Sequence, residues 1–185
     1  MEYHEAASFL FDLRRFQVKP GTAAVRDLLA ELGDPHEGVT FVQIAGSNGK
    51  GSVSRMVESV LREAGLTVGL YTSPHLDDVR ERVRIDGRKI PESSLVEFVE
   101  RARPFLLDRA AGGEPLTFFE TVTAMGLWEF GRAGVDVAVL EAGMGGALDA
   151  TSVVDPAASA VTNVALEHTR VLGDSIEEIA TTKAA

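Results

Sequence analysis

A short apolar run that breaks into a glycine-rich turn constrains the fold of this chain more than any other feature. Residues 39–45 read Val-Thr-Phe-Val-Gln-Ile-Ala, the pattern of a buried strand, and residues 46–52 read Gly-Ser-Asn-Gly-Lys-Gly-Ser. Apolar residues at helical spacing then run from Val53 to Ala64. Backbone N–H groups of such a turn can converge on phosphate oxygens, and the following helix adds a positive dipole. The pattern therefore predicts a phosphate-binding loop.

The loop offers a cation and a hydroxyl besides its backbone. Lys50 is placed to reach the terminal phosphates of a nucleotide, and Ser52 is placed to ligate magnesium. The general P-loop pattern has four residues before its Gly-Lys pair, but here Gly46 is followed by only two, and Gly51 precedes Ser52. A glycine-rich turn with a solvated lysine is the alternative, disfavoured because the chain has only four lysines against fourteen arginines. The candidate nucleotide-binding residues are Gly46, Ser47, Asn48, Gly49, Lys50, Gly51 and Ser52.

Composition argues against several classes of function. A net charge of −10 and a pI near 4.9 disfavour a nucleic-acid surface, because such proteins carry a basic stripe. The one basic cluster, residues 80–84, is interrupted by Glu81 and fits an exposed face as well as a ligand contact. The absence of cysteine rules out disulfides and thiolate metal sites. No membrane span or secretory leader is recognisable, so no membrane association is predicted and the cytoplasm is the expected location.

Periodicity and turn residues divide the chain into alternating helices and strands. The predicted helices, besides the one that follows the glycine-rich turn, are residues 4–15, 23–32, 93 or 94 to about 107, 117–130 and one that begins at Ser175. The predicted strands, besides 39–45, are residues 67–72, 135–140 and 158–164, with a small hairpin of residues 83–85 and 88–90. This alternation predicts an α/β fold, a P-loop doubly wound, mostly parallel sheet flanked by helices.

Local signals set several boundaries within these elements. Glu120 stands three residues after Thr117 and predicts a capping box, while Gly131 and Gly134 are expected to end the helix that follows. The last two strands are almost entirely apolar and are expected to be buried. In the final helix, Ile176, Ile179 and Ala180 are expected to face inward.

The elements also suggest how the chain is divided. Residues 1–38 are predicted to form a helical lead-in that packs on a nucleotide-binding domain, residues 39–185. The chain stops inside its last predicted helix, so we expect that domain to be incomplete.

Ligands of a doubly wound sheet bind at the carboxyl ends of its strands. Glu141 leaves an apolar strand, where a carboxylate is costly unless a cation meets it, so a magnesium role is favoured over a core role. His168 on its own is more often a packing residue, and Lys183 on its own fits a solvated helix lysine. The candidate groups after the predicted strands are Lys50, Ser52, Ser73, His75, Glu141, Asp149, Asn163, Glu167 and His168.

Eight segments carry a family resemblance. They are Ala-Gly-Ser-Asn-Gly-Lys-Gly-Ser (45–52), Gly-Leu-Tyr-Thr-Ser-Pro-His-Leu (69–76), Arg-Glu-Arg-Val-Arg (80–84), Phe-Phe-Glu-Thr-Val-Thr-Ala (118–124), Leu-Glu-Ala-Gly-Met-Gly-Gly (140–146), Leu-Asp-Ala-Thr (148–151), Thr-Asn-Val-Ala-Leu-Glu-His-Thr-Arg-Val-Leu-Gly (162–173) and Glu-Glu-Ile-Ala-Thr-Thr-Lys-Ala (177–184). Together, and with its shortened loop, the chain resembles the folylpolyglutamate synthase and dihydrofolate synthase family, a branch of the Mur ligases. The resemblance implies the central, ATP-binding domain of a Mur ligase.

The resemblance implies ATP and two magnesium ions as cofactors, with the ATP phosphates on residues 49–52. It also implies that Lys183 is carbamylated, which turns a cation into a carboxylate-like ligand for the second ion. The implied metal-binding residues are Ser52, Ser73, Glu141, His168 and carbamylated Lys183. The implied catalytic residues are Lys50, Lys183 and His168. The residues implied to lie near the pterin or folate are Pro74, His75, Arg82, Phe118, Phe119 and Asp149.

The implied chemistry is ATP-driven amide formation. A carboxylate of dihydropteroate or a folate attacks the γ-phosphate of ATP, and the amine of L-glutamate displaces phosphate from the resulting acyl phosphate. The partners are thus small molecules, and a monomer is expected for the full-length protein. The family's C-terminal, glutamate-presenting domain is absent, so this chain alone is expected to be inactive.

The sequence departs from the family pattern at four positions. Glu167 stands where the family usually has Asp, which preserves the charge, and Ala147 stands where a basic residue is common. Ser152 replaces the usual Asn, and Ala185 replaces Gly. The change at residue 147 removes a possible anion contact and leaves open the preference between dihydropteroate and polyglutamylated folate.

Two other functions remain alternatives. A small-molecule kinase would account for Lys50 and Ser52 but would leave the segments 69–76 and 162–173 without a purpose. A nucleotide-binding module that regulates a partner without chemistry would not need the acidic magnesium residues.

Overall fold

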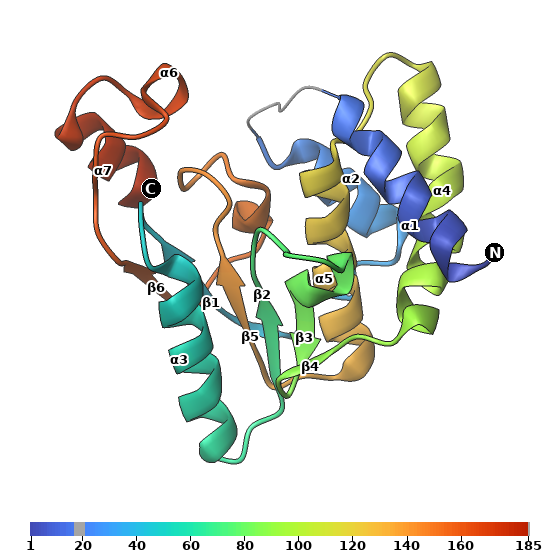
Figure 1. Cartoon of the computed structure of the whole chain (residues 1–185), viewed down its shortest axis with the longest axis horizontal. Coiled ribbons are helices and arrows are strands. Elements are labelled where there is room, and N and C mark those ends of the chain that lie inside the picture. The colour runs from blue at the N-terminus through green and yellow to red at the C-terminus, as the bar shows by residue number, and fades with distance from the viewer. Residues whose placement is uncertain (17–20, 185) are drawn as a thin grey trace.

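The computed structural model describes residues 1–16 and 21–184, and its centre is a six-stranded sheet (Figure 1). The strands are β1 (Thr40–Ala45), β2 (Val68–Tyr71), β3 (Val83–Ile85), β4 (Arg88–Lys89), β5 (Val137–Glu141) and β6 (Ala158–Val161), in the order β4-β3-β2-β5-β1-β6. The four strands β2, β5, β1 and β6 are parallel, and the β3–β4 hairpin adds an antiparallel edge. The predicted α/β fold with a mostly parallel sheet is confirmed.

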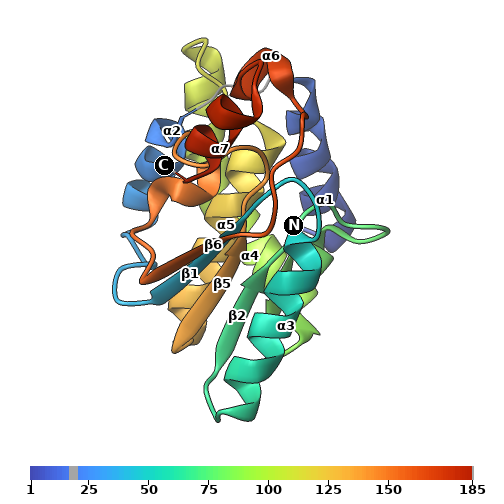
Figure 2. The same ribbon diagram turned by 90° about the vertical axis from the view of Figure 1, so that its left-hand side faces the viewer.

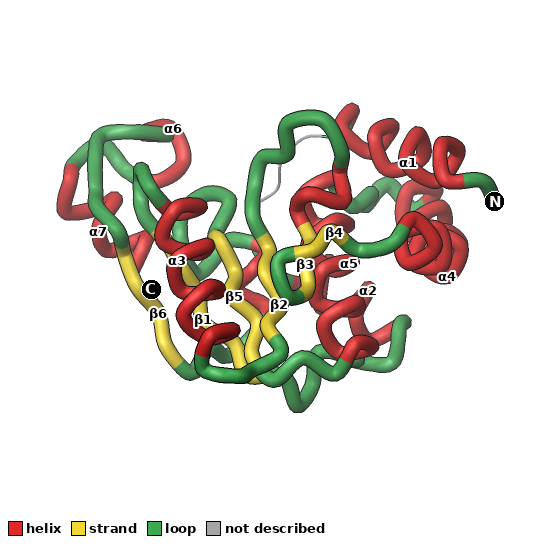
Figure 3. The backbone as a smooth tube through the Cα atoms, turned by 60° about the horizontal axis from the view of Figure 1, so that its bottom comes forward, coloured by secondary structure: helices red, strands yellow, loops and turns green. Residues whose placement is uncertain are grey.

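Helices cover both faces of this sheet (Figures 2 and 3). One face carries α3, and the other carries α5 and α2, with α1 and α4 packed outside them. The helices are α1 (Tyr3–Asp12), α2 (Ala23–Glu31), α3 (Lys50–Glu63), α4 (Glu92–Ala111), α5 (Phe118–Ala133), α6 (Thr169–Leu172) and α7 (Ile176–Ala184), with short 3₁₀ turns η1 (Leu13–Arg15), η2 (Val79–Arg82) and η3 (Ala150–Val153). None of the helices in the described part of the chain is long and apolar enough to cross a membrane.

The sheet separates two apolar clusters. Beneath α3, four buried residues of the sheet, including Ile44 and Val139, meet partly buried residues of the helix such as Val57. The larger cluster lies on the other face and includes Leu10 of α1 and Leu28 of α2. The predicted lead-in, residues 1–38, therefore shares one core with the sheet and α5, and its boundary as a separate unit stays a prediction.

The strand order decides which loops meet. β5 lies between β1 and β2, with Glu141 paired to Ile44 and Leu140 paired to Tyr71. On the other side of β1, Val161 of β6 is paired to Ala45. Because these strands are parallel, their carboxyl ends lie at one edge of the sheet, and Glu141 emerges between the glycine loop and the turn after β2.

Several predicted elements differ in detail. The capping box of α5 is confirmed, since Glu120 accepts the Thr117 N–H at 2.7 Å. α4 begins at Glu92, after its N-cap Pro91, and runs to Ala111 rather than ending near residue 107. The prediction that the last strand is buried is wrong, because β6 lies at the sheet edge and all four of its residues are exposed.

The predicted inward orientation of the last helix is confirmed for Ile179, which is fully buried. Ala180 is partly buried, and the prediction is wrong for Ile176, which is 42% exposed. Ile176 is the first residue of α7, and the buried residues of this helix, Ile179 and Lys183, follow it. A residue at a helix end is less constrained by the apolar stripe than one in its middle.

Of the two glycines predicted to end α5, Gly134 does so and Gly131 does not. The helix continues to Ala133 and ends at Gly134, whose φ is +63°. At Gly131 the helix backbone approaches the turn that follows α2, and a Cβ atom there would overlap the carbonyl oxygen of Pro35. The glycine is thus required by a close approach between two backbones.

We expect Gly131→Ala to destabilise the folded protein by about 3 kcal/mol, because the added methyl group meets backbone that cannot rotate away. Urea unfolding monitored by circular dichroism measures the change. Gly112→Ala is the matched control: a Cβ there would contact its nearest atoms at 3.6 Å, and its expected effect is within about 0.5 kcal/mol. Equal midpoints for the two variants would contradict the close approach.

Candidate active site

The glycine loop joins β1 to α3 through two glycines with positive φ. Gly46 has a φ of +137° and Gly49, the N-cap of α3, has a φ of +78°. A side chain at Gly46 would overlap the Thr162 hydroxyl behind the loop. The loop therefore needs glycine at its first position because the segment after β6 packs directly against it.

Two lysines converge on the carbonyl oxygen of Gly46. Lys50 donates from Nζ to this oxygen at 2.8 Å and to the Ser47 carbonyl at 3.1 Å. Lys183 donates to the same Gly46 oxygen at 3.2 Å and to Oε1 of Glu167 at 3.0 Å. Lys183 is only 5% exposed, so interpreting it alone as a solvated helix lysine would have been wrong.

Glu167 lies beside this pair of lysines. Burial alone would raise the pKa of its carboxyl group, but the hydrogen bonds from Lys183 and Ser47 and the nearby positive charges hold that pKa below its usual value. Glu167 is thus a carboxylate in contact with Lys183, as the preserved charge at this position suggests.

Glu141 is a buried carboxylate at the mouth of the loop. It is 5% exposed and its Oε2 accepts the backbone N–H of Ser73 at 2.9 Å. Burial raises the pKa of Glu141, while the Ser73 N–H and the charges of Lys50 and Arg55 oppose that rise.

The first turn of α3 faces this carboxylate closely. A Cβ atom at Gly51 would lie 3.4 Å from both carboxylate oxygens of Glu141, so the glycine keeps space between the helix and the acid. Ser52 follows in the same turn, and Ser73 comes from the end of β2. Carboxylate and hydroxyl oxygens are the ligands that magnesium prefers, so this donor set fits the ion that the sequence predicts.

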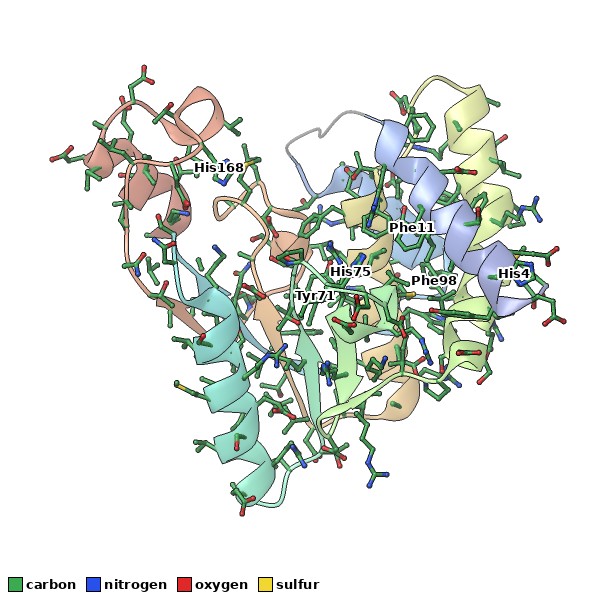
Figure 4. All side chains as sticks on the ribbon, viewed as in Figure 1. His4, Phe11, Tyr71, His75, Phe98 and His168 are labelled. Atoms are coloured by element: carbon green, nitrogen blue, oxygen red, sulfur yellow. The ribbon has the colours of Figure 1, made fainter. Side chains whose placement is uncertain are left out.

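The structure does not join His168 to Glu141 by a hydrogen bond. It is exposed, has a φ of +47° and is the N-cap of α6, and Figure 4 shows it on the side of the molecule that carries α6 and α7. Within residues 1–16 and 21–184, no three His, Asp or Glu side chains form a group that could hold a metal ion. The roles of His168 as a catalytic and a metal-binding residue stay predictions.

A cavity of about 380 Å³ opens beside Glu141. Ser73 and Pro74 form one part of its wall, and the loop of residues 143–150 forms another. The cavity brings together four of the predicted substrate residues, namely Pro74, Arg82, Phe119 and Asp149. Arg82 is buried there, so at this position the basic cluster of residues 80–84 is not a solvated face.

Asp149 shapes the cavity wall. Its Oδ1 accepts the N–H and the hydroxyl of Thr151 at 2.9 and 2.6 Å, and its Oδ2 accepts the N–H of Met144 at 2.7 Å. Burial raises the pKa of Asp149, and these hydrogen bonds oppose the rise. The carboxylate therefore organises the loop in addition to lining the cavity.

The other two predicted substrate residues, His75 and Phe118, lie in a stack beside the cavity. Arg82 donates from Nε to Nδ1 of His75 at 2.8 Å, and Nη2 of Arg14 lies 3.2 Å from Nε2. The ring of Phe118 stacks on Phe11 with centroids 5.7 Å apart. Burial and the two arginines lower the pKa of His75, which keeps its ring neutral at pH 7. Figure 4 labels His75 and Phe11 in this region.

The turn that carries His75 and Arg82 is fixed by two acids. Glu81 accepts the N–H groups of Leu76 and Asp78 at 3.0 and 3.1 Å. Asp78 accepts the Arg80 N–H at 2.9 Å and the Tyr3 hydroxyl at 3.0 Å, which ties the turn to α1. Burial would raise the pKa of Asp78, but its bonds to Arg80, Lys89 and Tyr3 hold that pKa well below its usual value.

Comparison with known proteins places the chain in a family. No family model matches the sequence. A probable bifunctional folylpolyglutamate synthase/dihydropteroate synthase of Haloferax volcanii is 76% identical over 185 residues, all of this chain. The folylpolyglutamate synthase of Lacticaseibacillus casei is 39% identical, again over the whole chain. A solved FPGS-AMPPCP-folate complex matches the whole chain with a TM-score of 0.92 and 39% identity. This chain belongs to the folylpolyglutamate synthase and dihydrofolate synthase family.

The chain spans only part of its relatives. It covers 22% of the Haloferax volcanii protein, 44% of the Lacticaseibacillus casei protein and 45% of the chain in the solved complex. It thus corresponds to the N-terminal part of a folylpolyglutamate synthase or dihydrofolate synthase.

Some contacts around the site were not predictable from the sequence. Arg14 and Phe11 meet His75 and Phe118 across the end of α1, although helical periodicity gave them no role. Asn163 was named only as a polar group after a strand, whereas its side chain and backbone both bind the glycine loop. A polar residue directly after the strand beside the phosphate loop was the available signal.

Proposed function

We propose that this chain is the ATP-binding part of a ligase that joins L-glutamate to dihydropteroate or a reduced folate. One observation carries the proposal: Ser73 lines the cavity and also donates its N–H to Glu141 beside the glycine loop. A phosphate held on the loop and an organic acid held in the cavity would therefore meet at Ser73. An acyl-phosphate route requires that meeting, because the γ-phosphate must transfer to a carboxylate of the acceptor.

The nucleotide side of the site has the charges that phosphoryl transfer needs. Magnesium, when bound, supplies neutralisation of the phosphate oxygens. Ser52, Ser73 and Glu141 would hold it, and Lys50 would exchange its bonds to loop carbonyls for bonds to phosphate oxygens. ATP as the nucleotide is supported by the solved FPGS complex with AMPPCP.

The cavity has the chemistry of a site for an aromatic acid. Phe119 offers a ring face, and the buried guanidinium of Arg82 can bind a carboxylate or a ring carbonyl. The volume of about 380 Å³ lies within the range of small-molecule sites. The solved FPGS complex holds folate, which supports a folate or its precursor as the occupant.

We infer that dihydropteroate is among the acceptors. The Haloferax volcanii relative, 76% identical, is named as combining folylpolyglutamate synthase with dihydropteroate synthase. A chain that also makes dihydropteroate would supply that acid directly to this site.

We also propose that Lys183 becomes carbamylated and then serves a second magnesium ion, as the resemblance implies. Its burial and its position on the Gly46 carbonyl support the proposal, because a carbamate formed there would lie at the nucleotide loop. Mass spectrometry of the intact protein in bicarbonate buffer would test it through a gain of one carbamate, absent in Lys183→Arg.

The experiment that tests the function is ADP release by the protein in its complete natural form, with ATP and magnesium. Dihydropteroate, tetrahydrofolate or no pteridine is added, each with and without L-glutamate. We expect sustained release only when both an acceptor and glutamate are present. Release that needs no glutamate would indicate the kinase alternative, and binding of ATP without release would indicate the regulatory module.

A further inference from the structure

The first half of the glycine loop is bound to the segment that follows β6. The Ser47 N–H donates to the Asn163 carbonyl at 2.9 Å. The Asn163 side chain pairs with both backbone groups of Asn48, accepting from its N–H at 3.0 Å and donating to its carbonyl at 3.2 Å. Thr162 donates to the same carbonyl at 2.7 Å, and Ala165 donates to the Ser47 hydroxyl at 2.9 Å.

These bonds change which donors the loop can offer. Residues 46–51 are predicted to offer N–H groups to phosphate, but in this structure those of Ser47 and Asn48 donate to Asn163. The N–H groups at the start of α3, from Lys50 to Ser52, have no acceptor within the helix. The N–H groups without an acceptor in the loop therefore lie at its helix end, next to Glu141.

This arrangement also accounts for the shortened loop. A general P-loop has four residues before its Gly-Lys pair, and this chain has only Ser47 and Asn48 there. Those two residues form hydrogen bonds with Asn163 and Thr162, the residues that follow β6. These bonds continue the hydrogen bonding between β1 and β6 beyond the ends of the two strands.

We propose that Asn163 is a positioning residue for the nucleotide: its side chain holds Asn48 so that only the α3 end of the loop receives phosphate. The proposal rests on the proposed binding of ATP. Asn163 touches no substrate itself. It acts by keeping the loop in its binding conformation before the nucleotide arrives, which reduces the ordering cost of binding.

The test is binding of AMPPCP with magnesium, measured by calorimetry on the protein in its complete natural form. We expect Asn163→Ala to weaken AMPPCP binding about tenfold and Thr162→Val about threefold, because the first loses two bonds to Asn48 and the second loses one. Ser159→Ala, an exposed serine on β6, is the matched control and should bind as the wild type does.

Measurements other than AMPPCP binding distinguish a positioning role of Asn163 from a role in the stability of the fold. In Asn163→Ala the thermal midpoint and the binding of folate should stay at wild-type values, and the Asn48 amide should exchange its hydrogen faster. AMPPCP binding within twofold of wild type, or equal losses in nucleotide and folate binding with a lower midpoint, would overturn the proposal. Failure of the wild-type protein to bind AMPPCP would instead remove the proposed function on which it rests.

Discussion

Lys50→Ala is expected to lower kcat/KM for acceptor- and glutamate-dependent ADP release by about a thousandfold. Lys50 is the cation at the start of α3, and its Nζ donates hydrogen bonds to the carbonyl oxygens of Gly46 and Ser47 at 2.8 and 3.1 Å. Its removal takes away the positive charge that would offset the charge on the transferring phosphoryl group. Steady-state kinetics with ATP as the varied substrate measures the loss.

The variant Lys50→Arg tests whether a positive charge alone is sufficient at this position or whether the shape of the lysine ammonium group is also needed. A guanidinium is planar and longer than an ammonium, so we expect it to recover little of the lost rate. Lys89→Ala is the control, because Lys89 is an exposed residue of β4 that pairs with Asp78, and its loss should change the rate less than twofold. If Lys50→Ala keeps more than a tenth of the wild-type rate, the glycine loop is not the phosphate site.

Glu141→Gln is expected to reduce the rate about a hundredfold and to shift the magnesium requirement to higher concentration. Glutamine keeps an oxygen that can accept the Ser73 N–H, which Glu141 now accepts at 2.9 Å, but it removes the charge. Burial raises the pKa of Glu141, so its ionised form is disfavoured by the fold. Thermal stability of the variant at pH 7 should therefore equal or exceed that of the wild type.

Glu129→Gln is the control for a buried glutamate that stabilises the fold and is not expected to bind magnesium. Glu129 is also a buried glutamate, but it bonds Ser94 and Arg132 inside the helical layer, away from the glycine loop. Its replacement should lower the thermal midpoint and leave the magnesium dependence unchanged. Magnesium titrations and melting curves on both variants decide the matter. A Glu141→Gln protein that melts early with a normal magnesium curve would mark Glu141 as a structural carboxylate.

Local signals predicted the site best where chemistry and secondary structure occur in one short segment. The strand, glycine loop and helix around Lys50 lie where they were expected, and so does Glu141 at the end of β5. The Thr117–Glu120 capping box was readable for the same reason, because both partners lie within one turn. Boundaries that depend on packing were not readable, as the continuation of α5 through Gly131 demonstrates.

The amino-acid sequence alone determined the alternation of helices and strands, the phosphate loop and the family, because these rest on local periodicity and on short ordered motifs. Only the tertiary structure decided that β5 lies between β1 and β2, which brings Glu141 to Ser73. It also decided that Lys183 is buried and donates a hydrogen bond to the Gly46 carbonyl, and that the Asn163 side chain accepts one from the Asn48 N–H. Each of these contacts joins residues far apart in the chain, and no local pattern specifies which distant backbone a side chain will meet.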